Sequence, residues 1–387
     1  MKQINPFQLK VISSPELFCD RETELDILLD HVRNGAHTLL ISPRRYGKTS
    51  LIEIAFRQLR SEGVVCLLAD LYRVDSADTL VQTIAAALIK GLHWKPDKTL
   101  TERLRGLFRS MVPQITIGEK SISVAFQYSK TSDELPPLDD VMDAIGRFAQ
   151  ESGKRVCVAF DEFQEITELP RSKHIEGIMR EYIQRQEGVS YIFAGSRRRI
   201  LTKMFREKKR PFFKLAFTVP LPEIPEEDFT QYVIDRFAKT GKTCERLAAQ
   251  KIYKLSRGYP YYIQKLAFLA WGRTVVRCSR PTVEKAHRAL LEMESGEFEA
   301  IWQGLSLVQK QVLRALAFEP TASPYAMSYV TRHRFGSTSG LRKALMVLED
   351  KDFVERYPRT DEYRLTDPYL AYWMREAPER RISLERN

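Results

Sequence analysis

Five short apolar runs divide the first 220 residues, at 37–42, 64–69, 155–161, 189–195 and 214–220. Each run is continuously apolar rather than alternating, which is typical of strands that are buried on both faces. Amphipathic stretches with helical spacing lie between the runs, near 49–60, 77–90, 138–151, 172–187 and 197–206. This order predicts a parallel sheet covered by helices, and therefore an α/β domain over residues 1–222.

The stretch between the second and third runs departs from this pattern. Residues 93–137 contain a short helical pattern near 100–112 and then two β-like runs, separated by Gly118, Glu119 and Lys120. A turn of this kind between two β-like runs is typical of a hairpin. We therefore predict a hairpin insertion in the α/β domain.

After Pro222 and Pro225 the pattern becomes wholly helical. Four helices are predicted, at 226–239, 244–256, 260–276 and 281–297, which would form a lid over residues 223–300. Residues 301–387 show three helical stretches and then two strand-like pieces around a polar turn, an order that predicts a winged helix. Ser337 is expected to cap a helix of this domain whose apolar stripe is Leu341, Ala344, Leu345 and Leu348.

Residues 42–49 match the phosphate-loop pattern GxxxxGK[ST] except that Ser42 replaces the first glycine. The loop joins a predicted strand to a predicted helix, so its backbone N–H groups would surround a phosphate at the helix N-terminus. Lys48 is expected to contact the β- and γ-phosphates and Thr49 to ligate Mg²⁺. The predicted contacts to the nucleotide are Ser42, Pro43, Arg44, Arg45, Tyr46, Gly47, Lys48, Thr49 and Ser50.

Two alternatives weaken the phosphate-loop assignment. A Gly-Lys-Thr turn can arise by chance between a strand and a helix. Serine at position 42 would cost about 1 kcal/mol if its φ were positive, which would weaken the site without abolishing it. In that case Ser42→Gly should tighten nucleotide binding.

Polar residues follow other apolar runs at the same expected edge of the sheet. Asp161 and Glu162 end the run at 155–161, where one carboxylate could hold Mg²⁺ and the other could polarise an attacking water. Ser196 follows the run at 189–195 and could contact the γ-phosphate or the water, or could only cap the next helix. Asp70 follows the second run, and a surface position is favoured for it.

Together these segments resemble the archaeal-type P-loop ATPases of the AAA+/STAND division, over nearly the whole chain. The matching motifs are a leading F-x-x-R-E-x-E-L at 18–25, P-R-R-x-G-K-T-S-L at 43–51, the strand ending in Asp161 and Glu162, and G-x-P at 258–260. The resemblance implies an ATP or ADP site with Mg²⁺, with Phe18, Arg21 and Pro260 near the adenine and Ser196 as sensor. Asp20 departs from the family, which usually has glycine before the arginine.

Residues 197–214 hold nine basic residues and one acid. Related AAA+ proteins place here an arginine that reaches the γ-phosphate of a neighbouring subunit, and Arg210 is the best candidate, followed by Arg206. Recognition of this kind would need a homo-oligomer. A solvated basic face and a nucleic-acid contact are the alternatives.

The remaining composition limits the partners. Five widely spaced cysteines suggest neither a zinc site nor a disulfide framework, and no apolar run is long enough to span a membrane, so we expect a cytoplasmic protein. The formal charge is +11, but the winged helix has only 14 Lys and Arg against 11 Asp and Glu. The sequence therefore predicts an ATPase that drives remodelling or assembly, or a slow nucleotide switch that binds DNA or a protein through the winged helix or the basic segment 197–214.

Overall fold

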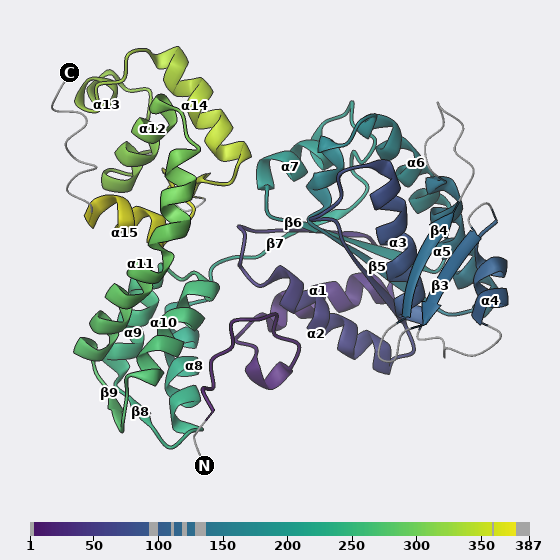
Figure 1. Cartoon of the computed structure of the whole chain (residues 1–387), viewed down its shortest axis with the longest axis horizontal. Coiled ribbons are helices and arrows are strands. Elements are labelled where there is room, and N and C mark those ends of the chain that lie inside the picture. The colour runs from purple at the N-terminus through teal and green to yellow at the C-terminus, as the bar shows by residue number, and fades with distance from the viewer. Residues whose placement is uncertain are drawn as a thin grey trace.

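A computed structural model describes residues 4–92, 100–109, 112–117, 122–127, 137–357 and 360–376. An α/β part, a helical lid and a winged helix follow one another along the chain (Figure 1). The lid and the winged helix lie together on one side of the α/β part, so that the molecule has two halves.

The α/β part is built on a five-stranded sheet whose order is β2-β5-β6-β1-β7, with every pairing parallel. The strands are β1 (Thr38–Ile41), β2 (Val65–Asp70), β5 (Val156–Asp161), β6 (Val189–Gly195) and β7 (Phe217–Pro220). All five coincide with predicted apolar runs. Because β1 lies between β6 and β7, the phosphate loop leaves the sheet next to the strand that ends at Gly195.

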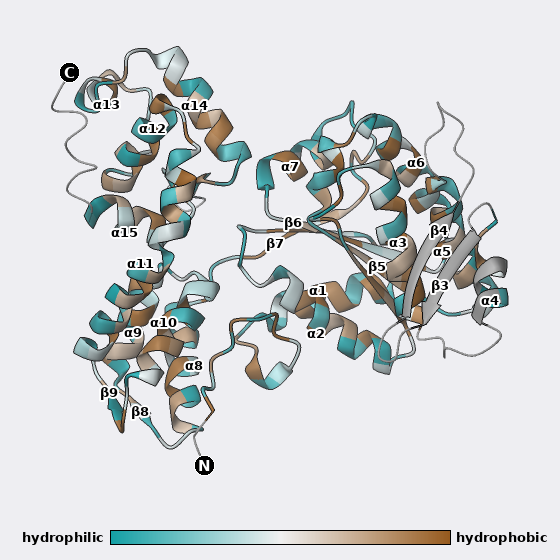
Figure 2. Ribbon diagram, viewed as in Figure 1, coloured by the Kyte–Doolittle hydropathy of each residue, from teal (hydrophilic) through white to brown (hydrophobic). Residues whose placement is uncertain are grey.

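Helices cover both faces of this sheet, as the continuous hydrophobicity of its strands requires. One face packs against α1 (Glu22–Arg33) and α2 (Lys48–Ser61). The other face packs against α3 (Ala77–Leu92), α5 (Leu138–Ser152), α6 (Ser172–Arg185) and α7 (Arg198–Arg206). Figure 2 shows the apolar strands and the apolar sides of these helices meeting in the interior.

Two short elements and an insertion complete this part. The 3₁₀ helices are η1 (Pro15–Leu17) and η2 (Phe163–Glu168). The insertion contains α4 (Leu100–Leu107) and an antiparallel hairpin of β3 (Val112–Ile117) and β4 (Ile122–Gln127), as predicted. Its predicted turn at 118–120 lies outside the described residues.

The lid has four helices and a small parallel ribbon that the sequence did not indicate. The helices are α8 (Glu226–Ala238), α9 (Arg246–Ser256), α10 (Pro260–Gly272) and α11 (Arg280–Gln303), and the ribbon pairs β8 (Thr243–Cys244) with β9 (Arg277–Cys278). Because α11 runs through position 300 without a break, the lid passes into the next domain along one continuous helix. No helix among the described residues is long and apolar enough to cross a membrane.

The last domain has the predicted order of three helices and two strands, followed by a further helix. Its elements are α12 (Leu307–Phe318), α13 (Met327–Arg332), α14 (Thr338–Asp350), β10 (Val354–Arg356), β11 (Tyr363–Leu365) and α15 (Pro368–Glu376). The Ser337 hydroxyl caps α14 by accepting from the Gly340 N–H, and the predicted stripe of α14 is buried. The lid and the winged helix share one hydrophobic core.

Candidate nucleotide site

The loop between β1 and α2 has the backbone shape of a phosphate loop. Arg45 (φ 64°) and Gly47 (φ 90°) have left-handed conformations, whereas Ser42 is not among the residues with positive φ. The strain considered for serine at position 42 is therefore absent. Its hydroxyl donates to the Pro43 carbonyl oxygen at 3.1 Å, which keeps this polar side chain satisfied in a buried position.

Lys48 lies inside this loop. Its ammonium group donates to the carbonyl oxygens of Ser42 (3.2 Å) and Pro43 (3.1 Å), and the residue is 5% exposed. Burial lowers the pKa of Lys48, while Glu162 and Asp161 act in the opposite direction. A buried cation bound mainly to neutral carbonyl groups is well prepared to exchange them for an anionic phosphate.

Thr49 and Asp161 face each other across the sheet edge. The Thr49 hydroxyl donates to Asp161 Oδ2 at 2.6 Å. Burial raises the pKa of Asp161, and the hydrogen bond from Thr49 partly offsets this effect. Hydroxyl and carboxylate oxygens are the hard ligands that Mg²⁺ prefers, so these two residues fit the metal role that the sequence predicts for them. Among the described residues, no group of three or more His, Cys, Asp or Glu side chains could hold a metal, so phosphate and water oxygens would supply the other ligands.

Glu162 is fixed by donors from two neighbouring segments. Its Oε2 accepts from Gln164 Nε2 (2.6 Å), from the Ser196 hydroxyl (2.9 Å) and from the Ser196 N–H (3.3 Å). The backbone of Glu162 is left-handed (φ 51°), a conformation that is uncommon for residues other than glycine. Ser196 does not cap α7, because Arg197 is the N-cap residue and no side chain caps that helix. The structure therefore disfavours the capping alternative.

Gln164 was missed as a site residue, and Gly195 explains how it fits. A Cβ atom built on Gly195 would lie 1.9 Å from Gln164 Oε1, a separation that no side chain tolerates. Glycine at the end of β6 thus leaves room for Gln164, which in turn holds Glu162. The glycine at the strand end was the only hint of this arrangement in the sequence.

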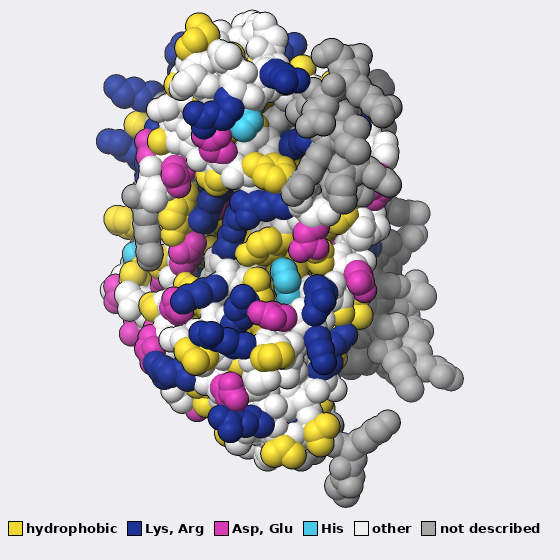
Figure 3. Space-filling view, turned by 90° about the vertical axis from the view of Figure 1, so that its left-hand side faces the viewer, with side chains coloured by type: hydrophobic (Ala, Val, Ile, Leu, Met, Phe, Trp, Pro, Cys, Tyr) yellow, Lys and Arg dark blue, Asp and Glu magenta, His cyan; other side chains and the backbone are white. Residues whose placement is uncertain are grey.

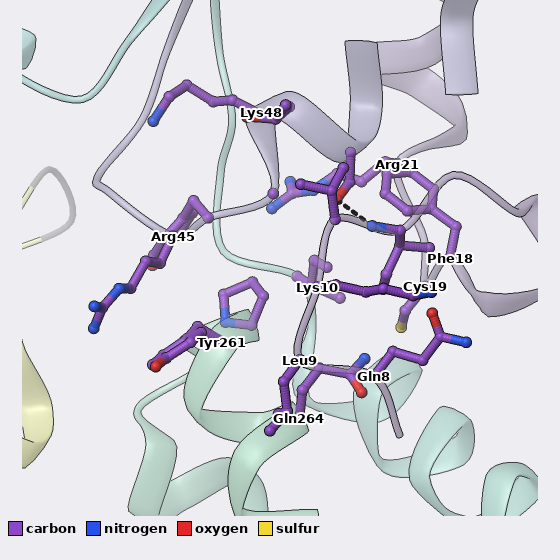
Figure 4. A pocket seen from close by; sticks show the side chains of 18 of the residues that line it. Gln8, Leu9, Lys10, Phe18, Cys19, Arg21, Arg45, Lys48, Tyr261 and Gln264 are labelled. Carbon is purple, nitrogen blue, oxygen red and sulfur yellow. Dashed lines mark hydrogen bonds between the residues drawn. The ribbon is translucent and has the colours of Figure 1, made fainter. Parts of the chain in front are cut away.

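A cavity of about 320 Å³ opens beside the phosphate loop. Figure 4 shows that its walls come from the N-terminal segment, the phosphate loop and α10. Ten of its residues were predicted, namely Phe18, Arg21, Arg45, Tyr46, Gly47, Lys48, Thr49, Ser50, Glu162 and Pro260. Tyr261 and Gln264 extend the wall along α10.

Residues 8–12 form a further wall of this cavity that the sequence analysis did not include. The Ile12 N–H donates to the Ser50 hydroxyl at 3.0 Å, which ties the segment to the start of α2. The alternation of Leu9, Lys10 and Val11 was a weak sign of an extended strap.

Arg21 has a clear structural contact. Its guanidinium donates to the Pro222 carbonyl oxygen (2.6 Å) and to Glu24 (3.1 Å), and the residue is 3% exposed. It thereby joins the segment at 18–25 to the end of the α/β part, directly before the lid. Asp20 (φ 57°) and Arg21 (φ 85°) are both left-handed, which gives a physical reason for the glycine that usually stands at position 20 in the family that the chain resembles.

A second cavity, of about 190 Å³, lies on the other side of Arg45 and Glu162. The predicted residues Arg44 and Ser196 line it, together with Asp352 and Asp367 of the winged helix. Asp352 Oδ2 accepts from the Arg44 N–H at 3.4 Å. Burial raises the pKa of Asp352 to about 7, although Arg198 and Lys48 lower it. A carboxylate of the winged helix thus lies against the phosphate loop.

The phosphate loop contacts the other half of the molecule at several points. Arg45 lies 3.7 Å from Glu297 of α11 and 4.4 Å from the centre of the Tyr261 ring of α10. Two further sets of contacts are the apolar seam and the ionic seam. The apolar seam is the contact of Tyr46 with Tyr259, whose ring centroids are 4.7 Å apart. The ionic seam joins the core to the winged helix through three contacts, Arg44 with Asp352, Arg198 with Glu355 (2.6 Å) and Arg199 with Asp350 (2.9 Å). Arg364 extends the ionic seam, because it binds Glu355 (2.7 Å) and Glu223 at the start of the lid (3.2 Å).

The ionic seam explains much of the basic segment 197–214. Arg198 and Arg199 bind winged-helix carboxylates, and Arg197 binds Glu168 of η2 at 3.0 Å. Arg210 binds Glu176 of α6, whose side chain is fully buried, and Arg210 does not line either cavity. Sequence reasoning did not consider this intramolecular use of the arginines. A role for Arg210 in a neighbouring subunit stays a prediction, and it would require this pair to separate.

Comparisons with known proteins agree with this architecture. A family model described as "Probable winged helix domain" matches residues 296–376. A Walker-type ATPase of Pyrococcus abyssi has a similar structure, with 17% identity, a TM-score of 0.70, and coverage of 96% of this chain and 99% of that chain. No curated protein sequence matches the chain.

Two proteins of Aeropyrum pernix are also similar. The ORC2 protein, solved in ADPNP–ADP complexes, is 16% identical with a TM-score of 0.60, over 99% of this chain and 98% of that one. The ORC1 protein, solved in complex with DNA, is 15% identical with a TM-score of 0.50, over 94% of both chains. At such identities the likeness concerns the fold. It confirms the predicted fold class, an α/β P-loop core with a helical lid and a C-terminal winged helix.

Proposed function

We propose that this protein binds and hydrolyses ATP with Mg²⁺, and that the nucleotide controls whether the winged helix stays docked on the core. The observation that supports hydrolysis most directly is the convergence of Lys48, the Thr49–Asp161 pair and Glu162 beside a cavity of about 320 Å³. Ligands of open α/β sheets bind at this edge.

Each residue has a separate role in this proposal. Lys48 binds the β- and γ-phosphates, and Thr49 and Asp161 hold Mg²⁺. The metal, when bound, neutralises charge on the phosphate oxygens. Glu162 accepts a proton from the attacking water, and Gln164 and Ser196 hold its carboxylate in position. The strap at residues 8–12, Phe18 and Pro260 surround the base; that the base is adenine is an inference from the family resemblance.

The ionic seam supplies the coupling. Asp352 accepts from a backbone N–H of the phosphate loop, which is the type of donor that binds phosphate. A γ-phosphate in the loop and an ionised Asp352 would repel each other across a short distance. ATP should therefore weaken the ionic seam, and loss of the γ-phosphate should restore it.

A second candidate function follows from the position of α14. Its exposed side carries Ser339, Arg342, Lys343 and Met346, which line a shallow hollow. Arg199 of α7 donates to the Met346 carbonyl oxygen at 3.3 Å, so the C-terminal half of α14 lies against the core. These side chains are already exposed in the docked state. Release of the ionic seam would also free the C-terminal half of α14 for DNA or a protein, and the chain would then act as a slow switch.

The charges of this half of the molecule favour neither partner. Figure 3 shows Lys and Arg side chains spread over the face that the winged helix and lid share, with acidic and apolar side chains between them. One of the similar structures contains DNA, and this makes DNA the first partner to test. An arginine in trans, with Arg210 as candidate, would require a homo-oligomer.

One experiment tests the proposed function. ATP and ADP affinity, turnover with and without DNA, and the distance between fluorophores on the core and on the winged helix are measured for the wild type and for Lys48→Ala. We expect the variant to bind ATP about 100-fold more weakly, because hydrogen bonds to charged groups contribute about 1.5–3 kcal/mol. The distance should increase with ATP only in the wild type. Equal ATP affinity in both proteins would refute the site, and an unchanged distance would refute the coupling.

A further inference from the structure

Two of the five cysteines face each other in the lid. Cys244 ends β8 and Cys278 ends β9, and the parallel ribbon pairs them directly in register. Paired strands lie about 4.8 Å apart, which falls within the Cα separation of about 4.4–6.8 Å that a disulfide requires. Both side chains point into the shared core of the lid and winged helix. The backbone therefore already has the arrangement of a cross-strand disulfide.

The two thiols also influence each other chemically. Their mutual hydrogen bond is the largest influence on both, and it raises the pKa of Cys244 and lowers the pKa of Cys278. Because the thiolate is the nucleophile in thiol–disulfide exchange, Cys278 is the residue that should react first.

The ribbon gives an oxidant a short path to these thiols. Each strand has two residues, and the hydrogen bonds Thr243 N–H to Val276 O (2.9 Å) and Glu245 N–H to Cys278 O (3.1 Å) hold them together. The preceding residues Val275 and Val276 are 88% and 66% exposed. Short exposed ribbons open with little free energy, so the thiols can meet a small reagent while the domain stays folded.

The sheet of the α/β part contains a matched control. Cys66 of β2 and Cys157 of β5 are also paired in register on parallel strands. These two residues lie in the middle of the layer between the sheet and helices α1 and α2, and they are 2% and 0% exposed. A reagent reaches them only if the sheet opens. Cys278 is as fully buried as Cys157, and Cys244 is 8% exposed. The two pairs thus have the same backbone geometry and differ in what must open to admit a reagent, a two-residue ribbon or a five-stranded sheet.

We propose that Cys244 and Cys278 form a thiol–disulfide site that a small disulfide closes into an intramolecular bond. The Cys278 thiolate attacks one sulfur of the oxidant and displaces a thiolate, leaving a mixed disulfide. The Cys244 thiolate then attacks the Cys278 sulfur and displaces the second thiolate. The protein gives up two electrons and two protons, and the oxidant becomes two thiols.

The new bond would close a ring over residues 244–278. This ring contains α9, α10 and the turn at Gly258–Pro260 between them, and Pro260 lines the cavity beside the phosphate loop. Because the ribbon already holds Cys244 and Cys278 in register, closure should stabilise the lid without moving this turn. The site is independent of the proposed ATPase activity.

The test uses the folded full-length chain and glutathione disulfide as the oxidant. After oxidation the protein is denatured and alkylated, and its tryptic peptides are identified by mass. We expect three of the five cysteines to be alkylated, and peptides 243–246 and 278–285 to be linked to each other. The oxidised protein should unfold at a temperature higher by roughly 5 °C than the reduced protein.

Variants assign the effect to this pair. Cys244→Ser and Cys278→Ser should each abolish the linked peptides and the thermal shift, measured as the difference between oxidised and reduced forms of the same variant. Cys66→Ser should retain both. The inference is overturned if all five cysteines are alkylated after oxidation, if the linked pair is Cys66 with Cys157, or if the 244–278 link appears only after the protein has unfolded.

Discussion

The two seams that join the phosphate loop to the other half of the molecule differ in chemistry. Tyr46 and Tyr259 of the apolar seam are 4% and 5% exposed, and Tyr46 belongs to the shared core of the lid and winged helix. The ionic seam begins only two residues away, where the Arg44 backbone N–H donates to Asp352. It continues through the charged pairs of Arg198 with Glu355 and Arg199 with Asp350. Burial of rings depends little on salt or on nearby charge, whereas ion pairs depend on both.

This difference assigns a separate task to each seam. The apolar seam is suited to keep the lid attached to the loop whatever nucleotide is present. The ionic seam contains a carboxylate, Asp352, beside the place where we expect the γ-phosphate, so its strength should follow nucleotide state. Experiments that change one seam and leave the other intact can therefore separate attachment from signalling.

The largest effect is expected for Glu162→Gln, which should hold ATP in the site and keep the ionic seam open. Loss of the proton acceptor should lower turnover by about 10²–10⁴-fold, while Lys48, Thr49 and Asp161 still bind the nucleotide. Turnover is measured under saturating ATP, together with the distance between fluorophores on the core and the winged helix. Glu168→Gln, at an exposed position of the adjacent 3₁₀ helix, is the matched control. Wild-type turnover in Glu162→Gln would show that another group accepts the proton.

Tyr46→Ala should be the most damaging change to the apolar seam. Truncation of a buried aromatic side chain costs about 3–5 kcal/mol of unfolding free energy, and the loss should be measured by denaturant unfolding. Tyr46→Phe keeps the ring and should be nearly neutral. If the ring only fills space, the nucleotide-dependent distance change will survive in Tyr46→Phe. A large stability loss in Tyr46→Phe would instead point to a role for the hydroxyl.

The sheet and the sites at its edge were predictable because their signals are local. Each strand is a continuous apolar run. Asp161 and Glu162 stand at the end of one run, and Lys48 and Thr49 belong to the phosphate-loop motif that follows another. The ribbon of β8 and β9 escaped prediction because two residues are too few to show a period. Likewise, the strap at residues 8–12 becomes part of the site only through the fold.

The ionic seam was not predictable for a different reason. Arg198 and Glu355 are 157 positions apart, and nine basic residues of one segment had many possible carboxylate partners. The pattern of charges does not state which arginine is buried against which acid. For Ser42 the sequence left a conditional expectation of strain, and the absence of a positive φ removes it. Ser42→Gly should therefore give no tighter nucleotide binding.

A smaller effect is expected from Arg198→Ala, which weakens the ionic seam alone. The Glu355 side chain is 2% exposed and would keep its ion pair with Arg364. We expect the winged helix to undock without ATP in a fraction of molecules that grows with salt concentration, because screening weakens the remaining pairs. The distance between core and winged helix is measured from low to high salt.

Arg199→Ala is the matched control for that change. Arg199 is on the same helix, but it and Asp350 are 47% and 44% exposed, and exposed pairs contribute about 0–1 kcal/mol. Its effect on docking should be slight. Equal undocking in both variants would mean that the total charge of α7, rather than the buried pair, holds the winged helix.

The smallest predicted effect is a pH dependence that originates in Asp352. In the docked state the pKa of Asp352 is raised to about 7, whereas an ordinary carboxyl has a pKa near 3.8. Between these two pH values the docked protein keeps a proton on Asp352 that the undocked protein has released. Docking should therefore be strongest below about pH 4, weaken as the pH rises to about 7, and stay constant above that value. Without nucleotide, the distance between the fluorophores should increase in the wild type from about pH 4 to about pH 7. The increase should be several-fold smaller in Asp352→Asn, because asparagine does not titrate. Asp350→Asn, two positions earlier and exposed, should behave like the wild type. Docking that strengthens as the pH rises would contradict this prediction. It would mean that attraction to Lys48 and Arg198 stabilises the ionised Asp352 carboxylate more than burial destabilises it. The γ-phosphate would then have to displace Asp352 by competing for the N–H groups of the phosphate loop rather than by repulsion.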